Sequence, residues 1–348
     1  MSLPPIEIPL GAMRFTSDSN KLEYWNGGAW FQLKTFSPNL ATSSDTQGVG
    51  ARALYMGGLK NQQPSPATTA EIDYYNISSA GNAQDFGDLT FNSYSLQTGS
   101  MASRTRAFTA GGSPNPGVNT INRCTFSSTG SAVDFGDRTV KSYFHGSHSN
   151  ATRGIFMGGY VHPGWNDTID YITMAHDGDA IDFGNMVSST GNGAVGGNPV
   201  RALQFGGVNH QTEIQKVQIT TLGNAQTFGD LKEGIHGAPG AVSNSTRIII
   251  AGGNGHPSPS KRNDIDLYLT ASGGTPLHFG ELSGSKSYGI GGAGDEVRGT
   301  FAGGYTPTQI NTIEYVSLLS GGLAVDFGDL TNVVRGGGSA SNAHGGLG

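Results

Sequence analysis

The sequence predicts an all-β fold assembled from six copies of one unit, and three observations point to it. Every copy carries an arginine five residues before a Gly-Gly pair and an isoleucine fourteen residues before a Phe-Gly pair. The copies recur about every 48 residues, a period typical of β-propellers and β-arrays. Glycine, at 56 of 348 residues, interrupts every segment, and no apolar stripe has helical spacing. The repeated residues are Arg52, Arg106, Arg153, Arg201, Arg247 and Arg298, with Ile72, Ile121, Ile169, Ile214, Ile265 and Ile313, and Phe86, Phe135, Phe183, Phe228, Phe279 and Phe327.

The last copy, from Ser287 to Leu330, shows how four strands follow from its residues. The glycine-rich run SYGIGGAGDEV predicts the first strand, and RGTFAG predicts the second. Apolar and polar residues alternate in TIEYVSL, as in a half-buried third strand, and LAVDFGDL returns as the fourth. The constant Ile-to-Phe distance predicts a hairpin of strands three and four with a fixed register. The C-terminal run VVRGGGSASNAHGGLG resembles another first strand and is a candidate to close the circle.

The predicted organisation is a small β module, residues 1–38, followed by a six-bladed β-propeller of four-stranded antiparallel blades, residues 39–348. The module has expected strands at 12–16, 21–25 and 29–33, with a turn at 17–20 between the first two. A three-stranded meander buries too little surface to be secure alone, so it is expected to attach the protein or to oligomerise it. Its candidate contact residues are Phe15, Tyr24, Trp25, Trp30 and Phe31.

Composition excludes several classes of protein. A formal charge of −6 and a pI near 5.8 argue against nucleic-acid binding, which needs a basic face. Cys124 is the single cysteine, so an intrachain disulfide is impossible. The N-terminal residues do not have the pattern of a signal peptide, and no apolar run reaches the roughly 18 residues that span a bilayer. Synthesis in the cytoplasm and no membrane insertion are therefore expected.

The repeated charged residues are predicted to be structural. Acids or amides flank each Phe-Gly pair, among them Asp88, Asp137, Asp230 and Asp329. Such carboxylates could suggest catalysis, or a magnesium motif of the Asp-Phe-Gly type, but catalysis breaks symmetry and these residues recur in every copy. We expect each repeated arginine to pair with an acid of its own or the adjacent blade, and the acids to bond backbone N–H groups at the turn into the next blade.

The connections between strands two and three vary most in length, from 8 to 15 residues between the Gly-Gly pair and the isoleucine. Variation confined to one connection is typical of a binding face. Aromatic rings beside amides and cations suit carbohydrate, because sugar C–H faces pack on rings. Solvated, proline-stiffened loops without a ligand are the alternative. The candidate residues are Tyr160, His162, Trp165, Asn166, His210, His256, Lys261, Arg262 and Tyr305.

Neither a cofactor nor a metal is predicted. The histidines at 162, 210 and 256 raise a zinc hypothesis, but they have no local ligand spacing. Asp177, Asp179 and Asp182 could hold calcium, but Asp182 belongs to the repeated position, which favours a turn. The chain has no Gly-x-Ser-x-Gly elbow, HExxH motif or P-loop. The protein is therefore not expected to be an enzyme.

Two resemblances suggest a function. Four-stranded units with a Gly-Gly pair after strand two resemble Kelch-type and galactose-oxidase-like blades, although Phe replaces the Kelch tryptophan. The run LGAMRFTSDSNKLEYWNGGAWFQL, with repeats ending in Asp-Phe-Gly-Asp-Leu (85–89 and 326–330), resembles tail-fibre and other virion proteins of tailed bacteriophages. This resemblance implies a homo-oligomeric virion appendage, a trimer being favoured, that binds other virion proteins through the module and a host-surface glycan or receptor through the propeller. The alternatives are a capsid-decorating or scaffold propeller without a receptor role, and a glycan-degrading enzyme.

Overall fold

The computed structural model describes residues 8–16, 21–32, 51–61, 66–96, 101–113, 117–255, 261–272 and 276–347. The chain divides into two compact units, Met1–Asn39 and Leu40–Gly348. The prediction of an all-β protein is confirmed, because both units consist of small, mostly antiparallel sheets.

The first unit is a three-stranded antiparallel meander of β1 (Met13–Thr16), β2 (Lys21–Trp25) and β3 (Trp30–Gln32). The three strands expected from the sequence are confirmed to within one residue at each described end, and the expected turn at 17–20 lies outside the described residues. Asn26 forms the second turn, where its side-chain oxygen accepts hydrogen bonds from the N–H groups of Gly28 and Ala29 at 3.0 and 2.8 Å. This Asx-type turn brings Trp30 opposite Trp25.

The strands of the second unit follow the sequence repeats, which we number one to six in chain order by their arginines; the strands of repeats six and one are joined in a single eight-stranded sheet. Repeat one comprises β4 (Arg52–Lys60), β5 (Ala67–Asn76) and β6 (Gln84–Ser93), joined by β29 (Gly338–Ser341) from the C-terminus. Repeat two comprises β7 (Arg106–Ala110), β8 (Thr120–Thr125) and β9 (Val133–Asp137). Repeat three comprises β10 (Gly146–Ser149), β11 (Arg153–Val161), β12 (Gly164–Thr173) and β13 (Ile181–Asn185).

The second half follows the same order. Repeat four comprises β14 (Ala194–Gly197), β15 (Arg201–Phe205), β16 (Glu213–Gln218) and β17 (Gln226–Asp230), with the short 3-10 helix η1 (Val208–His210). Repeat five comprises β19 (Gly240–Ser243), β20 (Arg247–Ala251), β22 (Arg262–Leu269) and β23 (Leu277–Lys286), with the two-stranded ribbon β18 (Ile235–His236) and β21 (Asn254–Gly255). Repeat six comprises β24 (Gly291–Gly294), β25 (Arg298–Ala302), β26 (Ile310–Ser317) and β28 (Val325–Arg335), with β27 (Gly322–Leu323) and the 3-10 helix η2 (Gly345–Leu347).

Repeat two departs from the expected four strands, because its sheet has three. The place of its first strand is taken by Met101 and Ala102, which meet β7 only through an isolated bridge between Ala102 and Ala107 and a hydrogen bond from the Phe108 N–H to the Met101 carbonyl. Ser149 of repeat three also binds this segment, because its hydroxyl accepts a hydrogen bond from the Ala102 N–H at 3.0 Å.

The constant Ile-to-Phe spacing has a structural cause. In every repeat the isoleucine stands opposite the glycine of the Phe-Gly pair, as Ile72 does with Gly87 and Ile313 with Gly328. A β-bulge follows this pair in all six repeats. The bulge fixes the register of the hairpin, so the predicted pairing of strands three and four is confirmed.

The first strands of the sheets are short and made mainly of small residues. Their sequences are GSHS, AVGG, GAVS, GGAG and GSAS, and every residue in them is buried. Small side chains let these strands approach one another closely: a Cβ at Gly292 would collide with the backbone of Ala241 in the preceding repeat. Each is an edge strand of its own sheet and packs against the corresponding strand of a neighbouring repeat, and we call these five strands the inner strands.

Buried apolar side chains of the described residues form six clusters, each between two consecutive repeats. Ile155 and Val195 belong to the cluster between repeats three and four, for example, and Ile249 and Phe301 to the one between five and six. The sixth cluster joins repeat six to repeat one through Phe327 and Tyr75. The order of contacts is therefore circular.

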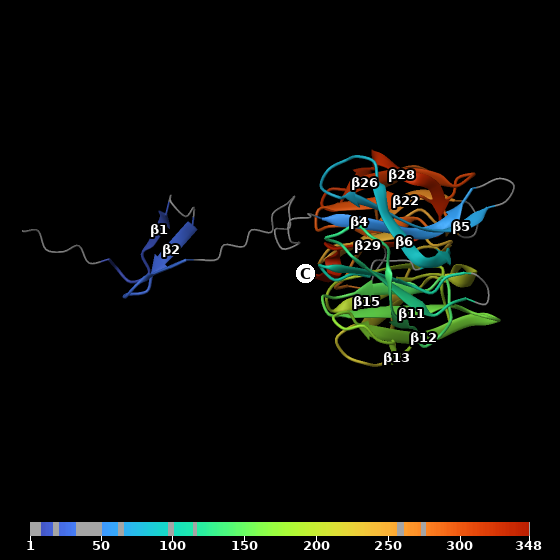
Figure 1. Ribbon diagram of the computed structural model, residues 1–348, viewed down its shortest axis with the longest axis horizontal. Coiled ribbons are helices and arrows are strands. Elements are labelled where there is room, and N and C mark those ends of the chain that lie inside the picture. The colour runs from blue at the N-terminus through green and yellow to red at the C-terminus, as the bar shows by residue number, and fades with distance from the viewer. Residues whose placement is uncertain are drawn as a thin grey trace, which may run out of the picture. The chain divides into compact units, whose positions relative to one another are not determined.

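The C-terminal strand makes the same closure. β29 pairs antiparallel with β4, from Gly338 opposite Met56 to Ser341 opposite Ala53. β28 of repeat six also pairs with β4, and Figure 1 shows β26, β28 and β4 together in one part of the unit. The expectation that the C-terminal run joins the first copy is confirmed.

The repeated arginines have partners other than the expected acids. In each repeat the guanidinium donates to backbone carbonyls at the end of strand three of a neighbouring repeat: Arg106 to Met174 and Ala175 at 3.0 Å, and Arg298 to Ile77 and Ser78 at 3.3 and 2.9 Å. None of the six forms an ion pair with a described carboxylate. The expectation of arginine–acid pairs was wrong. Backbone carbonyl oxygens at a strand end also accept hydrogen bonds, and they take the place of the expected carboxylates. The other partners are Phe126 for Arg52, Ile219 for Arg153, Thr270 and Ala271 for Arg201, and Leu318 and Leu319 for Arg247.

The acids after Phe-Gly also act differently from the expectation. The N–H groups of Asp88, Asp137 and Asp329 donate to side-chain oxygens of the next repeat, those of Ser131, Asp179 and Asn82. Asp230 accepts from the Thr212 hydroxyl within its own repeat at 3.3 Å. The expected direction of these hydrogen bonds was therefore wrong for the first three, although the role is structural.

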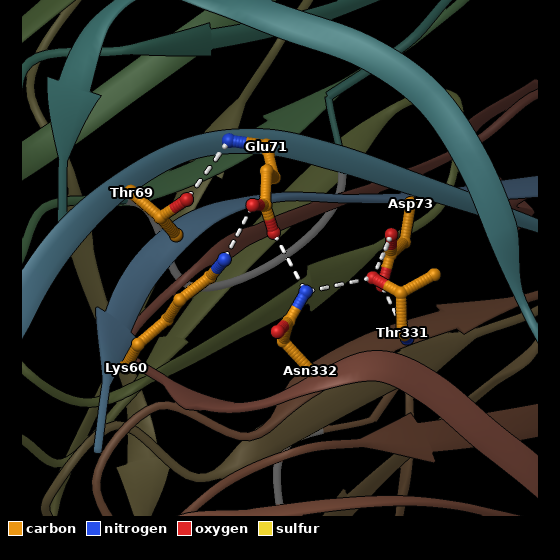
Figure 2. A network of polar contacts seen from close by, with 6 residues as sticks. All are labelled: Lys60, Thr69, Glu71, Asp73, Thr331 and Asn332. Carbon is orange, nitrogen blue, oxygen red and sulfur yellow. Dashed lines mark hydrogen bonds and ion pairs between the residues drawn. The ribbon is translucent and has the colours of Figure 1, made fainter. Parts of the chain in front are cut away.

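A second polar ladder lies one residue after each repeated isoleucine, at Asp73, Asn122, Asp170, Gln215, Asp266 and Glu314. Five of these side chains accept from the residues that follow the previous repeat's Phe-Gly motif; Asn122, for example, accepts from the Thr90 N–H at 3.0 Å. Figure 2 shows this link between repeats six and one, where Asp73 accepts from Thr331, and Glu71 accepts from Lys60 and from Asn332. Burial raises the pKa of the Asp73 carboxyl, and the Thr331 bonds oppose that shift.

The ladder's member in repeat three carries a fully buried ion pair. Asp170 accepts from the Arg138 guanidinium at 2.8 Å, and neither side chain is exposed to solvent. Asp170 also accepts from the N–H and hydroxyl of Thr139, both at 3.0 Å.

Replacing Asp170 by alanine is expected to destabilise the second unit by about 3–5 kcal/mol, because Arg138 is left buried without a counter-ion. The matched control is Asp137→Ala, an exposed aspartate next to Arg138, with an expected effect within about 0.5 kcal/mol. Urea unfolding of the two variants measures the difference. Equal midpoints for D170A and D137A would contradict the assignment.

Candidate functional site

One end of the circle of repeats is formed by the connections that lead from strand four of one repeat to the inner strand of the next. Each connection has at least one residue with a left-handed backbone, and six such residues, one in each connection, have φ angles between 47° and 71°. Such angles are uncommon outside glycine and need support from the surroundings. The residues are Ser95, Phe144, Asn192, Ala238, Tyr288 and Gly336.

Backbone hydrogen bonds link these connections to one another and supply that support. The Phe144 N–H donates to the Ser95 carbonyl at 2.8 Å, and the Asn192 N–H donates to the Phe144 carbonyl at 2.8 Å. The series continues to the Leu96 N–H, which donates to the Gly336 carbonyl at 3.3 Å. The connections thus form a mouth in which neighbours are joined by backbone hydrogen bonds.

A cavity of about 510 Å³ opens at this mouth. Its walls come from five of these connections and from Tyr305, which lies between β25 and β26, and Arg335 is the single charged group among the described residues that line it. Volumes of roughly 300–1,000 Å³ are typical of small-molecule sites. The main side chains are Tyr94, Leu96, Phe144, Tyr288, Ile290, Tyr305 and Arg335.

Arg335 is held by rings rather than by anions. Its guanidinium lies over Tyr305, 4.8 Å from the ring centroid, and 5.6 Å from the centroid of Tyr288. Lys261 also approaches the Tyr305 ring, with its Nζ 4.2 Å from the centroid. Two of the predicted ligand-binding residues, Lys261 and Tyr305, therefore lie together, and Tyr305 lines the cavity.

A second aromatic group adjoins the cavity through Phe144. The Trp165 ring lies 5.3 Å from Tyr160 and 6.4 Å from Phe144, and Tyr160 lies 5.1 Å from Tyr143, between ring centroids. Burial raises the pKa of the Tyr143 phenol, with smaller contributions from its neighbours Tyr160 and Tyr94. The structure therefore brings the predicted residues Tyr160 and Trp165 together.

The other predicted loop residues have different surroundings. His162 is exposed, 6.5 Å from Tyr160 between ring centroids. Asn166 accepts from the Thr168 N–H at 2.7 Å, so its oxygen serves the local turn. Arg262 is engaged by three carboxylates, Glu233, Asp264 and Asp266, at 2.9–3.2 Å, and lines a separate cavity. His210 ends η1, and His256 lies outside the described residues.

Possible metal ligands do not gather in the part of the chain that the structure describes, where no group of three or more His, Cys, Asp or Glu side chains is positioned to hold an ion. Asp177, one of the calcium candidates, pairs with Arg123 at 3.3 Å. Asp179 accepts from the Asp137 N–H at 2.9 Å. The helical segments among the described residues are all too short to cross a bilayer.

Sequence reasoning missed Tyr94, Phe144, Tyr288 and Arg335, because it followed only the connections of variable length. A signal was present: the pair Ser-Tyr stands before the inner strand at 93–94, 142–143 and 287–288. Aromatic residues that recur at one connection but not in all repeats indicate an asymmetric surface on a symmetric scaffold. Arg335 has no such signal, because repeats one and two have tyrosine at its position, Tyr94 and Tyr143, each directly before the left-handed residue of its connection.

The candidate attachment residues of the first unit lie on both faces of its sheet. Phe15, Tyr24 and Phe31 share one face with Met13, and their side chains are 65, 37, 47 and 60% exposed, in that order. Trp25 and Trp30 share the other face, with ring centroids 5.5 Å apart. There Arg14 lies over the Trp30 ring and pairs with Glu23 at 2.9 Å. The exposed apolar face, Met13, Phe15, Tyr24 and Phe31, is thus distinct from the partly covered tryptophan face.

Comparison with models of known protein families gives no match, and no curated protein is detectably similar to the chain in sequence. Inference about function therefore depends on the geometry of the cavity and of the exposed face.

Proposed function

We propose that the second unit is a six-bladed, Kelch-like β-propeller. Support comes from the circular order of the six apolar clusters and from β29, which completes the sheet of repeat one from the opposite end of the chain. The arginine ladder adds to this, since Arg298 of repeat six donates to the carbonyls of Ile77 and Ser78 in repeat one. In this architecture the cavity with Arg335 lies at one end of the central axis.

We further propose that the protein is a non-enzymatic virion appendage of a tailed phage, of the tail-fibre or spike type, that binds a host-surface glycan. The observation that carries the binding role is the aromatic-lined cavity of about 510 Å³ with one cation at the mouth of the repeats. The resemblance of residues 10–33 and of the Asp-Phe-Gly-Asp-Leu repeats to phage virion proteins supports the setting. Several copies on one particle would convert weak single contacts into firm attachment.

A glycan array probed with the full-length protein tests the binding role. We expect retention on at least one bacterial surface polysaccharide and no shortening of the polysaccharide chains after prolonged incubation. Depolymerised product would favour a glycan-degrading enzyme instead. Absence of binding both to the array and to intact bacterial cells would contradict a receptor-binding role and favour a decorating or scaffold protein.

The exposed face of the first unit is proposed to join copies of the chain, a trimer being favoured, and to contact other virion proteins. Light scattering after gel filtration is expected to show a multimer for the intact chain and a monomer after deletion of residues 1–36. The double variant Phe15→Glu with Phe31→Glu should also be monomeric, because charges then replace an apolar contact. The matched control is Ile181→Glu, at a 59% exposed position of the second unit. A monomeric intact chain is the outcome that opposes this proposal.

A further inference from the structure

The charge of the axial cavity is uncompensated. The Arg335 guanidinium forms no hydrogen bond or ion pair with any described residue, and no acidic residue is present among the described residues that line the cavity. Lys261 adds a second positive charge at the Tyr305 ring, which is part of the lining. A guanidinium stacked on rings keeps its N–H donors in its own plane, where a carboxylate can accept two of them.

The walls of the cavity suit a sugar better than a bare anion. Phe144, Tyr288 and Tyr305 offer ring surface, on which the C–H face of a pyranose packs, and the phenol groups can exchange hydrogen bonds with sugar hydroxyls. A small anion such as acetate would bind Arg335 and leave this apolar surface exposed to water. The cavity volume of about 510 Å³ also exceeds what a small anion fills.

The mouth is poorly suited to an extended peptide. A peptide that binds by strand addition needs a free edge of backbone N–H and carbonyl groups. At this mouth the carbonyls of Ser95, Phe144 and Ala238 already accept hydrogen bonds from the neighbouring connections. Recognition there depends on side chains, and those are aromatic and cationic.

We propose that the axial cavity binds a carboxylate-bearing sugar unit of an acidic polysaccharide. Arg335 holds the carboxylate by paired hydrogen bonds, and Tyr288 and Tyr305 keep the guanidinium in place and pack against the sugar. This inference rests on the proposed glycan-binding function and names its ligand class.

Calorimetric titration of the full-length protein with sodium D-glucuronate, sodium D-galacturonate and N-acetylneuraminate tests the proposal, with D-glucose and sodium acetate as neutral-sugar and bare-anion probes. At least one acidic sugar is expected to bind at least tenfold more tightly than glucose and acetate. Arg335→Gln should weaken that binding at least tenfold, and Arg335→Lys should fall between, because it keeps the charge and loses the planar fork. Lys232→Gln, an exposed lysine of repeat four with the same change of charge, should bind as the parent does.

Thermal unfolding of each variant distinguishes a lost contact from a lost fold, and Tyr288→Leu gives a second variant whose binding should fall while Arg335 is retained. Failure of all three acidic sugars to bind more tightly than glucose and acetate, or unchanged binding of the preferred acidic sugar to folded R335Q, would each overturn the proposal. Tighter binding of tri-glutamate than of every acidic sugar would overturn it in favour of a peptide ligand. Binding of neutral glycans alone on the array would leave the proposed function standing and remove this inference.

Discussion

Deletion of residues 338–348 is expected to abolish cooperative folding of the second unit, although it removes a small part of the chain. β29 is the inner strand of the sheet of repeat one, and its loss exposes the edge of β4 with the buried Leu54 and Met56. An open, apolar strand edge is a template for aggregation. The deleted segment also links repeats, because Ser339 and Ser341 each donate to inner-strand carbonyls of repeat six at 2.6 Å.

The comparison that decides this prediction is deletion of residues 1–36, which removes more of the chain but leaves the second unit intact. Circular dichroism during heating should give a sharp transition for that control and none for the 338–348 deletion. A synthetic peptide of residues 338–347, added during refolding, should restore the transition if strand pairing with β4 is the missing element. A sharp unfolding transition for the C-terminal deletion at the control's temperature would show that closure is dispensable.

Much of this architecture could be predicted from the sequence because the residues that determine it recur at fixed spacings in every repeat. The distance from Ile313 to Phe327 is constant since the isoleucine pairs with the glycine after that phenylalanine, and the bulge that follows recurs with it. The C-terminal strand was recognisable because its residues have the small-residue composition of an inner strand. A strand assignment that is ambiguous in one copy can be checked against the other five, and the register of one hairpin then predicts the register of the others.

Other features could not be predicted because their partners leave no pattern. Arg298 donates to the carbonyls of Ile77 and Ser78, and every residue has a carbonyl, so no acceptor could be read from the sequence. The acids near each Phe-Gly pair therefore seemed the natural partners. The ladder at Asp73 and its equivalents was recognisable from its six polar acceptors, yet its donors belong to the previous repeat, which only the packing of adjacent sheets reveals.

In the candidate site, too, some residues could be predicted from the sequence and others could not. Tyr305 and Lys261 were found because they lie in the connections of variable length, whereas Arg335 ends a strand and stands where repeats one and two have tyrosine. Its closeness to Tyr305 arises within repeat six, where the Gly304 N–H donates to the Val334 carbonyl at 3.0 Å, and the other repeats add Tyr94 and Phe144 to the same cavity. A binding surface assembled from non-equivalent residues of equivalent connections becomes visible only when the repeats are placed in space.

The second large effect expected is a loss of stability in mild acid, caused by three buried histidines. His145, His148 and His344 are at most 3% exposed. Burial lowers the pKa of His148 to about 3, with a further contribution from His344, and lowers the pKa of His344 to about 4. Burial, with the Arg138 charge adding to it, lowers the pKa of His145 well below its usual value.

Local contacts also require these side chains to be neutral. The Nε2 of His344 lies 3.0 Å from the Ala102 carbonyl, so it carries the proton, and Nδ1 accepts from the Gly346 N–H at 3.1 Å. Protonation at Nδ1 would set two donors against each other. Neither ring nitrogen of His145 has a hydrogen-bond partner among the described residues, and its ring lies edge-on to Phe156.

The sign of the effect follows from proton uptake. Unfolded histidine has a pKa near 6.5, so between about pH 6.5 and pH 4 the unfolded chain binds protons that the folded chain excludes. Stability is therefore retained above pH 6.5 and falls below it, by about 1.4 kcal/mol per pH unit for each histidine. Burial raises the carboxyl pKa of Asp73, Asp295 and Glu296, and these groups oppose the loss at the acidic end. The range from pH 7 to pH 5 is thus the clearest window for measurement.

Urea unfolding at intervals between pH 7 and pH 5 should show this decline in the free energy of unfolding. Single variants measure how much of the decline each histidine causes. His145→Phe keeps an aromatic ring against Phe156 and removes the titrating group, so it should flatten the pH dependence by about a third. His176→Gln, at an exposed position, is the matched control and should leave the slope as it is in the parent. A slope unchanged by His145→Phe, or flattened equally by His176→Gln, would show that the buried histidines are not its source. His148 lies in β10 and His344 follows β29, so acid should open the second unit first at these strands.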